Sequence, residues 1–245
     1  MKRLLIILPI LSLALAGCFR EPYADAYITP SLAYVGEDIH FTNTSSNTDY
    51  VEWDMGDGTT SSAFNVNHFY YDPGSYYVNL RAFGHNNDVS VASFVVDVLG
   101  SEIEIVVMEF FDEYYVEGAS VILYATYDDW LNFENPVGEE QFSNQYGECY
   151  FSNLSYQTYY VDVWEASHDN WYLGEDNPEQ WIETQQLPGG WDHTFIAYVN
   201  YYEPTAKKSA PLTRPATREL RAPLKSSVDN LPLKDNKFSI KKEKK

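Results

Sequence analysis

The side chains that most often carry out enzyme chemistry are few in this sequence and poorly spaced for it. The five histidines form no HExxH motif or other short zinc-binding spacing, and they lie at positions 40, 68, 85, 168 and 193. The sequence has no G-x-S-x-G motif, no phosphate-binding loop and no cysteine in the context of a nucleophile. Carboxylates are so abundant that a pair at glycosidase separation has little diagnostic weight. The sequence therefore predicts a protein that is not an enzyme.

Asp54 and Asp57 are the candidate ligands for a metal ion. Both lie in one glycine-containing segment, and calcium requires several oxygen ligands at one turn. No EF-hand loop is present, however, and turn aspartates also accept hydrogen bonds from nearby backbone amides. We therefore expect that Asp54 and Asp57 stabilise the turn and that the protein has no cofactor. Ca²⁺ binding is the alternative. His68 is expected to be a hydrogen-bonded strand residue and not a ligand.

Four tryptophans are the candidate ligand-binding residues. They lie in a stretch of about thirty residues between Val163 and His193, a length that is uncommon for a structureless loop and is often functional. Exposed indole faces would stack on sugar rings or anchor a partner protein, whereas buried ones would fix the loop to the domain as a second core. Both interpretations apply to Trp164, Trp171, Trp181 and Trp191.

The beginning of the chain has the pattern of an export signal. Lys2 and Arg3 precede a short apolar run, which ends in Leu-Ala-Gly directly before Cys18. About a dozen apolar residues are too few to span a bilayer comfortably. The tetrapeptide resembles a bacterial lipobox, which implies removal of residues 1–17 and lipidation of Cys18. An ordinary secretory signal with an incidental cysteine is the alternative.

This resemblance implies that the mature protein is tethered to a membrane and does not span it, because several acyl chains give stable anchoring. We expect the bacterial cell envelope, and the outer membrane in particular, with the face of that membrane left open. The second cysteine, Cys149, alternates with Phe151 on one strand face and is expected to be a small core residue.

The charge of the chain is divided unevenly. The net charge is −20, yet residues 18–204 hold 2 Lys+Arg against 32 Asp+Glu, and residues 205–245 hold 12 against 4. An acidic surface of this kind repels phosphate backbones, so nucleic-acid binding by residues 18–204 is excluded. The acidity is explained either by adaptation to high salt or by a divalent-ion or cationic-partner surface.

The elements that would position these residues are short strands. From Ala26 onward, alternating apolar and polar residues are interrupted by Gly, Asn, Asp and Pro about every ten residues, without a helical period. Runs around Phe41, Trp53, Leu80 and Val96 each place one apolar face inward. The pattern predicts a β-sandwich.

The turns between these strands carry a specific motif. It consists of a W-D-M-G-D-G turn, an H-x-Y strand and a P-G-x-Y-x-V-x-L strand, formed by Trp53, Asp54, Gly56, Asp57, Gly58, His68, Tyr70, Pro73, Gly74 and Tyr76. In this order it resembles a polycystic kidney disease (PKD) repeat, with Met55 where the family has Phe. The resemblance covers residues 28–99, after a linker at residues 18–27. It implies an immunoglobulin-like sandwich that serves outside the cell as a spacer or binding domain, without catalytic residues.

A second strand-rich unit is predicted over residues 101–204. It contains the phrases V-x-G-A-x-V-x-L-Y, G-x-x-x-F-x-N-L and Y-Y-V-x-V, which begin at Val116, Gly147 and Tyr159. These resemble the transthyretin-like domains grouped with carboxypeptidase regulatory and collagen-adhesin B-type repeats. The resemblance implies a β-sandwich of about seven strands that acts as a stalk, spacer or accessory binding domain.

Residues 205–245 have the composition of a disordered tail. They contain four prolines, one aromatic residue and an excess of positive charge, so they bury too little apolar area to offset chain entropy. The tail is expected to fold back loosely on the acidic modules, to meet an anionic envelope surface, or to serve solubility alone.

Together these features predict an all-β protein with two tandem β-sandwiches, held at the envelope through lipid on Cys18. The expected function is non-enzymatic: binding, adhesion or spacing, with an envelope protein as partner. The alternative is a glycan-binding surface lipoprotein that uses the tryptophan-rich loop. Fold class by itself does not decide between them.

Overall fold

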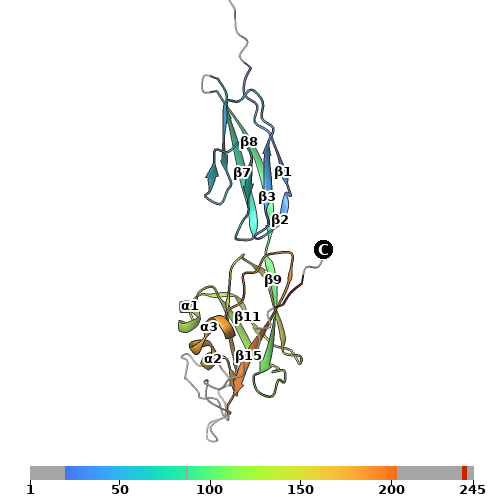
Figure 1. Ribbon diagram of the computed structural model, residues 1–245, viewed down its shortest axis with the longest axis vertical. Helices are drawn as coiled ribbons and strands as arrows, with labels where there is room; N and C mark the ends of the chain where they lie inside the picture. Colours follow the sequence, from blue (N-terminus) through green and yellow to red (C-terminus); the bar gives the residue numbers. More distant parts are fainter. Residues whose placement is uncertain (1–19, 86–87, 203–238, 242–245) are drawn as a thin grey trace, which may run out of the picture.

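The protein is all-β and consists of two β-sandwiches in tandem, as predicted. The computed structural model describes residues 20–85, 88–202 and 239–241. The predicted signal peptide, Cys18 and most of the predicted basic tail lie outside the described residues. Figure 1 shows the two sandwiches end to end along the long axis of the molecule, with the described N-terminal residues at the far end of the first. We call residues 20–99 the first module, and residues 101–202 with 239–241 the second module.

The first module packs two sheets face to face. A three-stranded sheet has the order β1-β3-β6, and a five-stranded sheet has the order β2-β8-β7-β4-β5. Its strands are β1 (Ala26–Thr29), β2 (Leu32–Tyr34), β3 (Ile39–Asn43), β4 (Tyr50–Asp54), β5 (Thr60–Ser61), β6 (Val66–His68), β7 (Gly74–Phe83) and β8 (Val89–Leu99).

Alternation explains why these segments form half-buried strands. In β3 every second residue is buried, and β4 buries Val51 and Trp53 while its other residues stay more exposed. The core contains Phe41 and Trp53 in an edge-to-face contact, with ring centroids 5.8 Å apart. Met55 is also buried there, so a thioether fills the position of the family's Phe.

The second module is built from one rolled sheet whose halves face each other. Its strand order is β11-β10-β13-β14-β15-β9-β12, with β16 paired to β15, and β15 runs parallel to β9. The strands are β9 (Ser101–Glu109), β10 (Ser120–Tyr124), β11 (Pro136–Phe142), β12 (Glu148–Leu154), β13 (Tyr160–Glu165), β14 (His168–Asp169), β15 (Asp192–Tyr201) and β16 (Ser239–Lys241).

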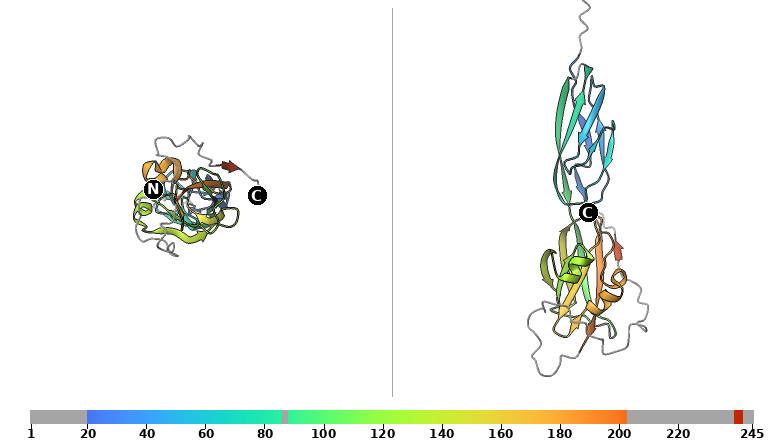
Figure 2. Two further views of the ribbon diagram at one scale, coloured as in Figure 1. Left: turned by 90° about the horizontal axis from the view of Figure 1, so that it is seen from below. Right: turned by 90° about the vertical axis from the view of Figure 1, so that its left-hand side faces the viewer.

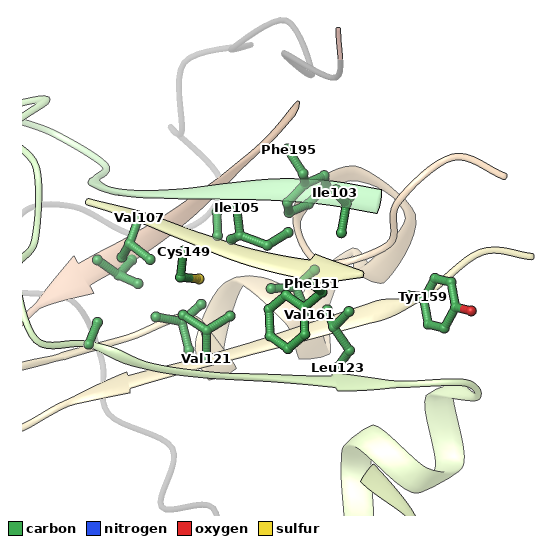
Figure 3. Close-up of a cluster of buried hydrophobic side chains, with 14 of the residues drawn as sticks. Ile103, Ile105, Val107, Val121, Leu123, Cys149, Phe151, Tyr159, Val161 and Phe195 are labelled. Carbon is green, nitrogen blue, oxygen red and sulfur yellow. The ribbon is translucent and has the colours of Figure 1, made fainter. Parts of the chain in front are cut away.

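Alternate residues of these strands serve two different cores. Figure 3 shows side chains of β9 and β12 pointing toward those of β10 and β13, which makes the first core. Cys149 lies in this core and is 4% exposed. Burial raises the pKa of its thiol to about 12, so it behaves as the expected small core residue.

The opposite face of β10, β13 and β15 is covered by three short helices. These are α1 (Tyr127–Asn132), α2 (Trp171–Asp176) and α3 (Pro178–Trp181), and the side chains between helices and sheet form the second core. Because both faces are covered, the four residues Val161–Trp164 of β13 are all buried. Among the described residues no helix has the length and apolarity to cross a membrane.

One part of the segment 205–245, for which the sequence predicts disorder, forms a strand. Ser239–Lys241 forms β16, which pairs antiparallel with the beginning of β15 (Figure 2). Backbone hydrogen bonding to an available strand edge orders Ser239, Ile240 and Lys241 although they lie in a polar tail.

Candidate functional site

The two modules are joined through a single residue. β8 ends at Leu99 and β9 begins at Ser101, so Gly100 is the whole connection. A Cβ atom at Gly100 would lie 2.5 Å from Cα of Asn153, a distance that excludes any other residue without a backbone shift. The joint is therefore short and closely packed.

Hydrogen bonds across the joint fix the modules to each other. The amide of Gly189 donates to the carbonyl oxygen of Val35 (3.0 Å), and the amide of Tyr156 donates to that of Tyr71 (2.7 Å). The hydroxyl of Ser155 donates to Oδ1 of Asp72 (2.6 Å).

Aromatic packing accompanies these hydrogen bonds. The ring of Tyr156 covers Gly36 so closely that a Cβ atom there would lie 2.9 Å from it. The same ring lies 6.0 Å from that of Tyr71, centroid to centroid. Together with the hydrogen bonds, this contact restricts movement between the modules, so the joint is stiff and is not a free hinge.

A cleft of about 320 Å³ lies beside this joint. Both modules contribute to it, through Tyr34, Leu99, Gly100, Glu102, Ser152, Asn153, Gly190, Trp191 and Asp192. Two aromatic and two acidic residues thus line one hollow, at the lower end of the ~300–1,000 Å³ range of small-ligand sites. It is the candidate site of this protein.

The predicted motif of the first module forms a tight turn between β4 and β5. The amide of Gly56 donates to Oδ1 of Asp54 (3.0 Å), and the amide of Thr59 donates to Oδ1 of Asp57 (2.9 Å). Gly56 has φ +82°, and a Cβ atom there would lie 2.7 Å from the carbonyl oxygen of Tyr77. Both aspartates therefore bond within the turn.

The H-x-Y strand fastens this turn to the neighbouring sheet. Nε2 of His68 lies 2.8 Å from Oδ2 of Asp57, and the buried hydroxyl of Tyr70 donates to the carbonyl oxygen of Met55 (2.8 Å). The ring of Tyr70 stacks on Tyr76 with centroids 3.8 Å apart. One hydrogen-bonded corner thus brings together the motif residues Asp57, His68 and Tyr70.

The comparison with known families agrees with this corner. Residues 20–98 match the PKD domain. The sequence resemblance covers residues 28–99. The match to the family therefore begins eight residues earlier and ends one residue earlier. No catalytic family is indicated.

Several solved structures are similar to parts of the chain. The PKD1 domain from Vibrio cholerae metalloprotease PrtV is 26% identical, with 32% of this chain and 98% of that one covered and a TM-score of 0.29. The PKD1 domain of Vibrio anguillarum Epp is 22% identical, with 32% and 94% covered and a TM-score of 0.29. The major pilin subunit BcpA of Bacillus cereus is 14% identical, with 74% and 71% covered and a TM-score of 0.30. No curated protein matches the chain.

The PKD corner contains a carboxylate whose pKa is shifted. Burial raises the pKa of Asp57, but hydrogen bonds from Thr59 and the contact with His68 outweigh burial and hold the pKa below the ordinary value of 3.8. A carboxylate with a lowered pKa stabilises the fold above the unfolded-state pKa, and this contribution is lost as pH falls through the folded-state pKa.

Asp57→Asn is therefore expected to make the PKD domain less sensitive to acid. As the pH is lowered below about 4, the melting temperature of the wild type should fall more steeply than that of the variant. The reason is that asparagine cannot titrate. Circular dichroism melts at a series of pH values measure this difference, with the exposed Asp88→Asn as control. Parallel pH profiles for wild type and Asp57→Asn would contradict the role of this carboxylate.

The structure gives the calcium hypothesis no additional ligands. Within residues 20–85, 88–202 and 239–241, no group of three or more His, Cys, Asp or Glu residues is arranged to hold a metal ion. Asp54 and Asp57 serve the turn, as the preferred interpretation of the sequence has it.

Three of the four candidate tryptophans are buried, which corrects the hypothesis that they present exposed rings. Trp164, Trp171 and Trp181 are 8%, 1% and 7% exposed and belong to the second core of the second module. Their indole faces are therefore not available for stacking on a sugar. The predicted loop instead contains β14, α2 and α3, which hold these rings against the sheet.

Trp191 differs from the other three. It is partly exposed and lines the cleft, directly after Gly190 and before the beginning of β15. Tyr34 and Glu102 also line this cleft, and neither belongs to a motif that the sequence reveals. Their sequence separation from Trp191 left no local signal by which they could have been found.

Sequence reasoning also missed the hydrogen-bonded group formed by Tyr114, His168 and Glu165. The hydroxyl of Tyr114 lies 2.7 Å from Nε2 of His168, and Nδ1 of His168 lies 2.7 Å from Oε2 of Glu165. Burial, followed by the charges of Glu109 and Asp112, raises the pKa of Tyr114, so its phenol stays protonated and acts as a donor. The arrangement ties the loop after β9 to the β13–β14 turn and does not supply a nucleophile.

Proposed function

We propose that this protein is a lipid-anchored component of the bacterial cell envelope that holds its second module at a fixed orientation away from the membrane. Its role is non-enzymatic: the PKD domain is a spacer, and the second module, which we take to be transthyretin-like, carries the binding surface. An envelope protein is the partner that we favour, and the outer membrane is the expected location.

The observation that carries this proposal is the stiff joint between the modules. A single residue connects β8 to β9, and hydrogen bonds cross the joint at Val35, Tyr71 and Asp72. A flexible linker would let the second module sample many positions, whereas this connection restricts it.

The position of the N-terminal segment supports the same role. Tyr23 pairs with Ser46, and the side chain of Asn47 donates to the carbonyl oxygen of Glu21 (3.1 Å). These contacts fix the chain a few residues after Cys18 at the end of the PKD domain that lies opposite the joint (Figure 1). A lipid on Cys18 would place the second module at the distal end.

Cys18→Ser is expected to release the protein from membranes, because the lipid is attached through the thiol. Fractionation of cells that express the full chain should show the wild type with the membranes and the variant in soluble fractions. Cys149→Ala is the matched control, since its thiol is buried in the second module and is not a lipidation candidate. Retention of Cys18→Ser in the membrane fraction would contradict the lipid anchor.

The glycan-binding alternative is weakened by the burial of Trp164, Trp171 and Trp181. Stacking on a sugar requires exposed ring faces. Of the four rings, Trp191 alone lines the cleft.

A further inference from the structure

The cleft at the joint has the chemistry of a site for positively charged side chains. Among the residues that line it, Glu102 and Asp192 are acidic, and Tyr34 and Trp191 are aromatic. Among the described residues that line the cleft there is no Lys or Arg. Carboxylates attract an ammonium group electrostatically, and aromatic faces bind it through cation–π contacts.

The carboxylates of Glu102 and Asp192 are not held by the side chains around them in residues 20–202 that the structure describes. Neither side chain forms a hydrogen bond or ion pair with a residue of 20–85 or 88–202 whose side chain the structure describes. By contrast, the neighbouring Glu104 accepts a hydrogen bond from Tyr150 (2.7 Å) and another from Thr194 (3.0 Å). Glu102 and Asp192 are therefore available to a cation that enters the cleft.

The strand pairing brings a lysine-rich segment to this cleft. In the antiparallel pair of β15 and β16, Thr194 lies opposite Ser239 and Asp192 lies opposite Lys241. β16 therefore runs toward the first residue of β15. Gly190 and Trp191, which line the cleft, directly precede that residue. The residues that follow Lys241 in the sequence are Lys-Glu-Lys-Lys.

We propose that the cleft binds the segment 242–245 of the same chain through its lysine side chains. The ammonium groups of Lys242, Lys244 and Lys245 are complementary to Glu102 and Asp192, and Tyr34 and Trp191 provide cation–π partners. Pairing of β16 with β15 keeps the segment near the cleft, so binding within the chain benefits from a high effective concentration. The C-terminal segment then touches both modules and braces the joint.

Charge argues for this occupant over other ligands. An anionic group such as a phosphate would meet Glu102 and Asp192, with no Lys or Arg among the described residues that line the cleft. A neutral sugar would use the rings but would leave the carboxylates without a charged partner. A lysine side chain satisfies both kinds of group.

The proposal is tested by titrating trilysine into the full chain by calorimetry. In the wild type the cleft is occupied, so trilysine should bind weakly. In Lys242→Gln/Lys244→Gln/Lys245→Gln the cleft is vacant, and trilysine should bind about tenfold more tightly, since it no longer competes with a tethered segment. Adding Glu102→Gln and Asp192→Asn to that variant should abolish the gain.

A matched control separates the cleft from a general effect of charge. Lys207→Gln/Lys208→Gln/Lys225→Gln removes the same three charges from the tail far from β16 in sequence, and it should bind trilysine like the wild type. Equal affinity for the wild type and the 242/244/245 variant would overturn the proposal. So would an equal gain in the control variant, a gain that survives loss of Glu102 and Asp192, or no trilysine binding by either chain.

The same titration at several protein concentrations distinguishes a segment of the same chain from one of a second copy. Competition within the chain is independent of protein concentration, whereas competition by a second copy increases with it. A concentration-dependent difference would therefore also overturn the proposal as stated. Tighter binding of a neutral methyl glycoside than of trilysine would instead identify a sugar site.

Discussion

Trp171→Ala is expected to lower the free energy of unfolding of the second module by about 3–5 kcal/mol, the usual cost of deleting a large buried aromatic side chain. Trp171 is fully buried at the start of α2, and its ring packs edge-to-face on Phe133 with centroids 5.7 Å apart. Its Nε1 also donates to Oδ1 of Asp162 (2.8 Å), a carboxylate inside the sheet. Alanine removes both the packing and this donor.

Urea unfolding combined with hydrogen exchange measures the loss and assigns it to one module. Exchange should accelerate in β13 and α2, while the strands of the PKD domain keep their protection. Tyr146→Ala is the control, because this ring belongs to the same module but is 56% exposed. A loss below about 1 kcal/mol would show that the ring is not part of the core, since surface substitutions usually stay within ±0.5 kcal/mol.

This result bears on any test for glycan binding. Loss of binding in Trp171→Ala or Trp181→Ala would follow from damage to the second core and would not identify a stacking surface. Trp191→Ala is the informative change, because that ring lines the cleft.

The strands could be predicted from the sequence because their burial follows a local rule. Ile39 and Phe41 in β3, or Ile103, Ile105 and Val107 in β9, alternate with less buried neighbours, and the sandwich buries the apolar members as expected. In the PKD domain the turn chemistry is also local, because Asp57 bonds to Thr59 and Asp54 bonds to Gly56.

The helices over the second core could not be predicted in the same way. α2 and α3 have six and four residues, too few for a helical period to show in the sequence. Asn177 and Pro178 do form a start signal, because the side chain of Asn177 accepts from the amide of Gln180 and Pro178 occupies the first turn. Whether nearby indoles are buried, however, depends on the sheet beneath them.

The candidate cleft was beyond local sequence reasoning for a different reason. Tyr34, Glu102 and Trp191 come from three distant parts of the chain, and they meet because Gly100 lets the two modules approach. The same applies to the pairing of β16 with β15, since composition predicts disorder for a tail but does not reveal a strand edge that accepts it.

Gly100→Val is expected to loosen the joint while leaving both modules folded. Valine suits an extended strand connection, but its Cβ would lie 2.5 Å from Cα and 2.6 Å from the carbonyl carbon of Asn153. Because both contacts are with backbone atoms, the segment that carries Asn153, Ser155 and Tyr156 must move away from the first module. The three hydrogen bonds across the joint then weaken, at a combined cost of about 2–4 kcal/mol.

Distance distributions between spin labels at Thr42→Cys and Glu139→Cys, one exposed site in each module, measure this loosening. The wild-type background should give a narrow distribution and Gly100→Val a broad one, with exchange of the Tyr156 amide accelerated at least about tenfold because that amide loses its acceptor. Gly58→Asn is the control: a Cβ there meets nothing within 4 Å, and asparagine tolerates positive φ. An equally narrow distribution in Gly100→Val would mean that the hydrogen bonds at Val35, Tyr71 and Asp72 do not depend on close approach at Gly100, and the spacer role would lose the observation on which it is based.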